Sequence, residues 1–294
     1  MYEPAFLSES ARPGPHIPLK MTKKGVLIMA DFNSSICITS VARTAAELLG
    51  VEAPAQSAPA IGAVKRAAEK KFGAAGVDRV LLYNPDAIAL WLYQKYTGLF
   101  EPAICAADMQ LPMLSVMPSV TPVCFASMYT GVMPEIHGIR KYEKPVLKQE
   151  TLFDALIRAG KKPVIISTAG DSISTIFLER NMDYFIYDTP EECNAKAMEL
   201  IEKDEYDLIA FYNGNYDATM HRFAPESKEA LDKLAENARV FAALEEAVKK
   251  HWAGHRTLLG YCPDHGCHEI DGGLGSHGLD MPEDMNVVHM FALI

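Results

Sequence analysis

Short apolar runs alternate with amphipathic segments along most of the chain, from Gly25 to the C-terminus. A short, continuous apolar run is typical of a buried strand, whereas apolar residues that recur every third or fourth position are typical of a helix. The pattern predicts strands over residues 25–30, 79–83, 164–166, 184–187, 208–212, 257–261 and 287–293. Strands that alternate with helices indicate an α/β fold, here a three-layer α/β/α sandwich around a mostly parallel sheet.

Start and stop signals place the helices between these strands. Thr151 has the character of a cap with Asp154 at the third helical position, and Gly50 ends the first helix as a residue that tolerates a left-handed backbone. Helices are predicted over residues 35–49 and 228–251, and from starts at Pro85-Asp86, Thr151 and Thr189-Pro190.

Composition narrows the classes of function. The 294 residues are 49% hydrophobic, which is enough for a substantial core, and no apolar segment approaches the roughly 20 residues of a membrane span. A formal charge of −10 without a Lys/Arg stripe argues against binding to nucleic-acid polymers or anionic membranes. Six scattered cysteines and an N-terminus unlike a signal peptide favour a cytoplasmic protein with reduced thiols. We expect a small anionic substrate, with bound metal ions as the source of positive charge; the composition leaves the oligomeric state open.

Carboxylates and imidazoles follow the ends of several predicted strands. That edge is where ligands collect in open α/β sheets. Oxygen and nitrogen donors of this kind suit an ion such as Zn²⁺. The candidate metal ligands are Asp31, Asp217, His221, Asp264, His265 and His277.

Two of these candidates, Asp217 and His221, are four residues apart, so one helical turn would bring both to the same side to share a metal. A surface carboxylate beside a solvated or core histidine is the alternative. Glycines surround His277 and follow His265, and they would let the backbone fold tightly around a charged centre. An ordinary mobile loop is the structural alternative for these glycines.

Thr121 is the candidate nucleophile. Pro122 fits the first position of a helix that runs to Gly131, which would make Thr121 the cap residue beside unpaired backbone N–H groups. Such a helix terminus favours an anion, so a hydroxyl there is placed to attack phosphorus. The alternative is that Thr121 only caps the helix.

Taken together, these residues resemble the alkaline phosphatase superfamily, and within it the branch of type I phosphodiesterases, nucleotide pyrophosphatases and phosphonoacetate hydrolases. The combination is specific although no single motif is, and it runs in the family's order from Gly25 onward. The segments that carry it are Met29-Ala-Asp31, Ser119-Val-Thr-Pro122, Thr130 to Ile139, Asp217-x3-His221, Asp264-His265-Gly266 and His277-Gly278.

The resemblance implies two divalent metal ions, Zn²⁺ or alternatively Mn²⁺. It assigns Asp217, His221 and His277 to one ion and Asp31, Asp264 and His265 to the other, with Thr121 as ligand and nucleophile. The implied activity is hydrolysis of a phosphodiester or pyrophosphate bond through a phosphothreonine. A phosphonate hydrolase, a phosphomonoesterase, a phosphomutase and a non-catalytic metal-binding homologue are the alternatives.

The chain departs from the family pattern near the expected substrate. It lacks the Asn that commonly follows the His-Gly-Ile motif, and it has Asp31-Phe32 where Asp-Gly is common. It also lacks the long insertion that caps the substrate in relatives, so we expect an N-terminal extension over 1–24, one domain over 25–294 and a candidate small lid or insertion over 51–112. The candidate substrate contacts are Phe32, Lys141, Tyr142, Lys144, Asn213 and Asn215.

Other readings of the motifs are less consistent with the sequence. Cys262, His265, Cys267 and His268 are spaced closely enough for a structural zinc knot, but Asp264 explains His265 better, and His137 is expected to shape a turn. No Cys/Ser-x-Pro-x-Arg segment is present for a sulfatase. No Gly-x-Gly-x-x-Gly follows the first predicted strand, as a dinucleotide-binding oxidoreductase would require.

Overall fold

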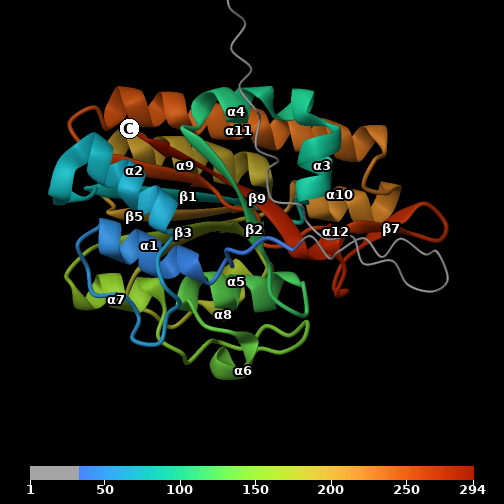
Figure 1. Cartoon of the computed structure of the whole chain (residues 1–294), viewed down its shortest axis with the longest axis horizontal. Coiled ribbons are helices and arrows are strands. Elements are labelled where there is room, and N and C mark those ends of the chain that lie inside the picture. The colour runs from blue at the N-terminus through green and yellow to red at the C-terminus, as the bar shows by residue number, and fades with distance from the viewer. Residues whose placement is uncertain (1–32) are drawn as a thin grey trace, which may run out of the picture. The chain divides into compact units, whose positions relative to one another are not determined.

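The computed structural model describes residues 33–294, and Asn33–Ile294 forms one compact unit. The expected N-terminal extension, the predicted strand over 25–30, Asp31 and Phe32 lie outside the described residues. A seven-stranded sheet runs through the unit in the order β2-β9-β6-β1-β5-β3-β4 (Figure 1). Its strands are β1 (Arg79–Pro85), β2 (Met109–Leu114), β3 (Pro163–Thr168), β4 (Asp183–Tyr187), β5 (Leu208–Asn213), β6 (Thr257–Tyr261) and β9 (Asn286–Leu293).

The sheet is mostly parallel, as predicted. β1 pairs in parallel with β5 and β6, and β3 pairs in parallel with β4 and β5. β9 alone runs the other way, because it pairs antiparallel with both β2 and β6. The carboxyl ends of β6, β1 and β5 therefore lie side by side at one edge of the sheet.

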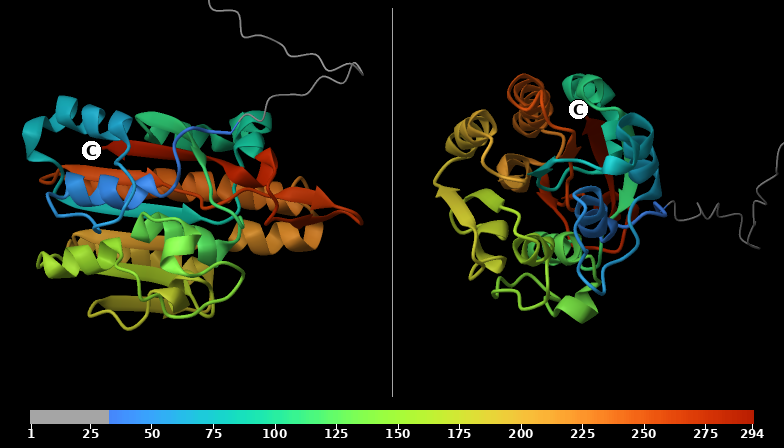
Figure 2. Two further views of the ribbon diagram at one scale, coloured as in Figure 1. Left: turned by 60° about the horizontal axis from the view of Figure 1, so that its bottom comes forward. Right: turned by 90° about the vertical axis from the view of Figure 1, so that its left-hand side faces the viewer.

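Helices cover both faces of the sheet, so the predicted three-layer α/β/α architecture is confirmed (Figures 1 and 2). One apolar core lies under α1 (Ser40–Leu48), α2 (Gly62–Phe72), α5 (Thr121–Thr130), α7 (Leu152–Arg158) and α8 (Ile173–Ile176). The other lies under α3 (Leu90–Lys95), α4 (Glu101–Ala106), α9 (Pro190–Lys203), α10 (Asn215–Phe223) and α11 (Lys228–His251). The remaining short helices are η1 (Gly73–Ala75), η2 (Thr97–Phe100), α6 (Pro134–His137) and α12 (Pro282–Met285).

The pleat of β5 shows how the two cores are separated. Leu208, Ala210 and Tyr212 belong to the core beneath α5, while Ile209 and Phe211 belong to the core beneath α11. Successive side chains of a strand point to opposite faces, which explains this alternation. Tyr212 and Asn213 at the end of β5 consequently face different helical layers.

The segment over 51–112, expected as a small lid or insertion, is instead part of the main sheet. It contributes β1, which is the central strand, and most of β2, which is an edge strand. The apolar run over 79–83 explains this placement, because all but the first residue of β1 is buried. Within residues 33–294, no helix is both long and apolar enough to traverse a bilayer.

The glycine-rich segment after β6 forms a small hairpin of β7 (His268–Ile270) and β8 (Leu274–Ser276). β8 packs against α10, and Figure 2 shows the hairpin extending beside that helix. The contact is close at Gly275, where an added Cβ atom would lie 2.3 Å from the Met220 Sδ atom. Gly275 therefore lets the hairpin approach α10, so the expected mobile loop is an ordered element of the site.

Candidate metal centre

Three carboxylates lie at the ends of three neighbouring strands. Asp86 directly follows β1, Asp264 lies three residues after β6, and Asp217 lies four residues after β5. Since β1 lies between β6 and β5, the topology brings these side chains to one edge of the sheet. Two groups of metal-ligating side chains result.

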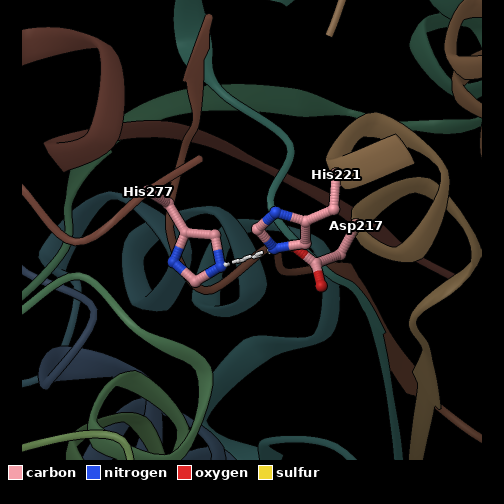
Figure 3. Close-up of side chains that lie close together, drawn as sticks. All are labelled: Asp217, His221 and His277. Atoms are coloured by element: carbon pink, nitrogen blue, oxygen red, sulfur yellow. Dashed lines mark hydrogen bonds and ion pairs between the residues drawn. The ribbon is translucent and has the colours of Figure 1, made fainter. Parts of the chain in front are cut away.

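The first group, called the outer cluster below, consists of Asp217, His221 and His277 (Figure 3). Asp217 and His221 are one turn apart in α10, and His277 directly follows β8. The Asp217 Oδ1 atom lies 3.2 Å from the His221 Nε2 atom and 3.5 Å from the His277 Nε2 atom. The helical spacing and the hairpin thus place one oxygen and two nitrogens around a common point.

The second group, the inner cluster, consists of Asp86, Asp264 and His265, all of them buried. The His265 Nε2 atom is 3.3 Å from the Asp86 Oδ1 atom and 3.4 Å from the Asp264 Oδ2 atom. The ring of His265 stacks on that of His277, with 4.1 Å between the ring centroids. The two clusters are therefore in direct contact.

Thr121 lies at the inner cluster. Its Oγ1 atom is 3.3 Å from the Asp86 Oδ2 atom and 3.3 Å from the His265 Nε2 atom, and the residue is 5% exposed. The expectation that Thr121 caps α5 is corrected, because Val120 is the cap and Thr121 is the first helical residue. No side chain caps this helix, so the hydroxyl of Thr121 is turned toward the carboxylates.

The donor atoms fit divalent cations. Each of the three histidines places its Nδ1 atom at a backbone carbonyl: His221 at Gly275 (2.9 Å), His265 at Gly266 (2.9 Å) and His277 at Ser119 (3.0 Å). An Nδ1–H group held in this way fixes the ring and leaves Nε2 as the ligand atom. All three Nε2 atoms point into the clusters.

The carboxylates give the same indication. Among the described residues, Asp86 Oδ1, Asp217 Oδ1 and Asp264 Oδ2 are buried oxygen atoms without a hydrogen-bond partner. Burial, with the nearby charges of Asp217 on Asp86 and of Asp86 on Asp264, raises the pKa of both inner carboxyl groups. Buried carboxylates that repel one another are costly unless a cation compensates them. The residues present thus suit metal ions in both clusters.

Asp86 was missed by sequence reasoning, which named Asp31 as the third inner ligand. Asp31 lies outside the described residues, and Asp86 occupies the place beside Asp264 and His265. Sequence reasoning assigned Asp86 to the start of a helix, yet α3 begins only at Leu90. The available signal was an Asp directly after a buried apolar strand, the same context that identified Asp264.

The candidate substrate contacts are not gathered at the clusters. Asn215 accepts a hydrogen bond from Asn237 and lies 3.4 Å from Glu236, so its side chain is directed to α11, and the Asn213 side chain accepts from the backbone N–H of Asn215. Lys141 pairs with Glu143 at the surface, Tyr142 is 62% exposed, and Lys144 donates to the Gly170 carbonyl. The site therefore contains no described counterpart of the family's phosphate-binding Asn among these residues.

The zinc-knot alternative is not supported by the geometry. Cys262 and Cys267 are buried thiols, and the Cys267 Sγ atom lies 3.7 Å from the Tyr216 hydroxyl. His268 bonds to Asp284 at 2.7 Å and is not part of either cluster. His137 bonds to Ser127 and accepts from the backbone N–H of Ile139, so it shapes the turn as expected.

Comparison with solved structures identifies the fold. The murine ectonucleotide pyrophosphatase/phosphodiesterase 5, in an inactive form bound to AMP, matches with a TM-score of 0.54 and 18% sequence identity over 66% of this chain and 59% of that one. The human form of the same protein matches equally well, with 58% of it covered. Phosphonoacetate hydrolase from Sinorhizobium meliloti matches with a TM-score of 0.51 and 18% identity over 67% of this chain and 59% of that one.

The chain has the fold of the alkaline phosphatase superfamily. It spans less than two thirds of the length of each of these structures. A scan of protein-family models finds no match, and a search of curated proteins finds none either. The alkaline-phosphatase-like fold predicted from the sequence motifs is thus confirmed, and it accounts for the clustering of ligands at the carboxyl edge of the sheet.

Proposed function

We propose that this chain is a metal-dependent phosphohydrolase that cleaves phosphodiester or pyrophosphate bonds through a phosphothreonine at Thr121. The observation that carries the proposal is the position of the Thr121 hydroxyl, 3.3 Å from both Asp86 and His265 at the junction of the clusters. Two neighbours of the same fold are described as a nucleotide pyrophosphatase/phosphodiesterase and a phosphonoacetate hydrolase. The proposal extends that chemistry to this chain.

The residues of each cluster have defined roles in the proposal. Asp217, His221 and His277 would hold one cation, and Asp86, Asp264 and His265 would hold the other, with Zn²⁺ preferred and Mn²⁺ as the alternative. When bound, the cations would lower the pKa of a nearby hydroxyl and neutralise charge on the phosphoryl oxygens. The structure shows candidate donor groups for both ions.

The chain's own groups then account for the chemistry. The Thr121 oxygen attacks phosphorus and the bond to the leaving group breaks, which yields a phosphothreonine; water later cleaves the new P–O bond and restores the hydroxyl. The Asp86 Oδ2 atom accepts the Thr121 hydrogen bond and so orients the oxygen. Pro122 and Val123 are buried behind it, so the nucleophile is held at the start of a rigid helix.

Charge supports a diester over a monoester. Two dications would exceed the three carboxylates of the clusters by a single positive charge. The strongest neighbouring charges on Asp86 and Asp264 are those of other carboxylates and histidines of the clusters, with no Lys or Arg among them. A phosphodiester carries one negative charge, whereas a monoester carries close to two at neutral pH, so the site is better matched to the diester.

The test is hydrolysis of bis-p-nitrophenyl phosphate, p-nitrophenyl phosphate and phosphonoacetate by protein loaded with Zn²⁺ or Mn²⁺. We expect the diester to be cleaved faster than the monoester. A Thr121→Ala variant should lose at least about 1,000-fold in kcat while retaining its metal ions. Thr130→Ala is the matched control, since Thr130 is a buried threonine of the same helix whose hydroxyl bonds only to the Ala126 carbonyl and the Val132 N–H.

Three results would contradict the proposal. Wild-type turnover by Thr121→Ala would exclude Thr121 as nucleophile, and faster cleavage of phosphonoacetate than of either ester would favour the phosphonate hydrolase. Inertness of the metal-loaded protein toward all three compounds would favour a non-catalytic metal-binding homologue.

A further inference from the structure

Tyr212 connects β5 to the inner cluster. Its hydroxyl is 2.5 Å from the Asp86 Oδ2 atom, which also accepts the hydrogen bond of Thr121. A phenol is an O–H donor to a carboxylate, so Oδ2 receives two donors. The other oxygen, Asp86 Oδ1, has no hydrogen-bond partner among the described residues and faces His265 at 3.3 Å. The two oxygens of Asp86 thus have separate surroundings.

The chain leaves space for this contact. A Cβ atom added at Gly214 would lie 2.6 Å from the Tyr212 hydroxyl oxygen, which is closer than real Cβ contacts. The backbone of Gly214 has a φ of −92°, so its conformation alone does not demand glycine. Phe125 packs edge-on against the Tyr212 ring, with 5.6 Å between the centroids. The ring is therefore held from one side while Gly214 keeps the hydroxyl end free.

We propose that Tyr212 is a positioning residue for the inner metal ion: its hydroxyl holds Asp86 so that Oδ2 faces Thr121 and Oδ1 remains free to bind the ion. This inference rests on the proposed function, because it assumes that the inner cluster binds a cation. Asp264 lies close enough to repel Asp86, so without the hydroxyl Asp86 would have only the longer hydrogen bond of Thr121 to keep its orientation. Outer-sphere partners of this kind are worth about 10–100-fold in metal affinity.

The experiment is a calorimetric titration of Zn²⁺ into the metal-free full chain. We expect two binding events in the wild type. Tyr212→Phe keeps the buried ring and removes only the hydroxyl, and it should weaken one event by about 10–100-fold while the other is unchanged. In turnover of the diester, the same variant should lower kcat and leave KM within about twofold, because an interaction with the nucleophile's surroundings acts in the transition state.

Tyr129→Phe is the matched control. Tyr129 is also fully buried beneath the same face of the sheet, and its hydroxyl donates to the Asn84 side chain at 2.6 Å, two residues before Asp86. Loss of that bond costs stability without touching either cluster, so both Zn²⁺ affinities should remain as in the wild type. A general loss of packing would instead affect the two variants alike.

A second variant tests the same contact from the other side. Gly214→Ala should displace the Tyr212 hydroxyl from Asp86 and weaken the same binding event, whereas Gly254→Ala, where an added Cβ meets nothing within 4 Å, should not. If the wild type binds two ions and Tyr212→Phe binds both with unchanged affinity, the inference is overturned and the proposed function stands. If the wild type binds no metal ion, both are overturned.

Discussion

His221 and His277 point their Nε2 atoms at each other across 3.2 Å, while both Nδ1 atoms lie at backbone carbonyls (Figure 3). Each Nδ1 donates its proton to a carbonyl, so each Nε2 presents a lone pair unless it carries a second proton. Two lone pairs cannot face each other at this distance without repulsion. A proton or a metal ion must therefore lie between the rings, beside the Asp217 carboxylate.

This relationship predicts that metal uptake releases a proton. The hydrogen bond to Asp217 raises the pKa of His221 to about 9, whereas burial and the neighbouring His265 lower the pKa of His277 to about 3. In the metal-free protein at pH 7, His221 thus holds the proton and His277 accepts it. A metal ion that binds both Nε2 atoms has to displace that proton.

The measurement is calorimetry of Zn²⁺ binding in buffers of different ionisation enthalpy, made on an Asp264→Asn variant in which only the outer cluster is complete. We expect release of about one proton at pH 7, and an apparent affinity that falls about tenfold for each pH unit below 9 and levels off above it. Binding that is independent of pH between 7 and 9 would show that His221 does not bind the ion through Nε2.

The identity of the inner ligand is the second prediction. Asp86→Asn removes a negative charge from the inner cluster, so the variant should retain one metal ion per chain and lose most diester hydrolysis. Asp31→Asn should retain two ions, because Asp86 already completes the cluster with Asp264 and His265. Metal content after gel filtration, measured by plasma mass spectrometry, distinguishes the two. One ion in Asp31→Asn and two in Asp86→Asn would restore Asp31 as the ligand.

A third prediction concerns His289 and stability. This fully buried side chain in β9 donates from Nε2 to the Pro263 carbonyl at 2.8 Å, and burial lowers its pKa to about 4. Because an unfolded histidine titrates near about 6.5, the unfolded chain takes up the proton first as the pH falls. The stabilising contribution of neutral His289 is therefore complete above pH 6.5 and is lost progressively toward pH 4.

Urea unfolding of the metal-free protein between pH 7 and 4.5 tests this prediction. His289→Gln keeps an N–H donor and cannot titrate, so its free energy of unfolding should depend less on pH than that of the wild type. The difference between the two slopes should approach about 1.4 kcal/mol per pH unit at the steepest point. Parallel curves for the two proteins would contradict the assigned burial effect.

The secondary structure that follows from local pattern was largely predictable. The helix over Lys228–His251 and the strand over Thr257–Tyr261 have the predicted bounds, and Ser227 caps that helix. Long amphipathic periodicity and a bounded apolar run are strong local signals. β2 was missed because it is an edge strand that contains Pro112, and a proline within an apolar run argues against a strand unless it lies at an edge.

The candidate site was only partly predictable. Asp217, His221, Asp264 and His265 could be found because each lies in a recognisable local context after a predicted strand. Asp86 could not be chosen over Asp31 on that basis, since both follow apolar runs. The distinction depends on β1 lying between β5 and β6, and such pairing between distant segments is not written in local periodicity.

The central claim is that two metal ions lie beside the Thr121 hydroxyl, and anomalous X-ray scattering from crystals grown with Zn²⁺ tests it most directly. The account predicts two anomalous peaks, one bounded by Asp217, His221 and His277 and one bounded by Asp86, Asp264 and His265. The Thr121 oxygen should lie within coordination distance of the second peak, at about 2.0–2.2 Å. A single peak, or two peaks away from these side chains, would contradict the account.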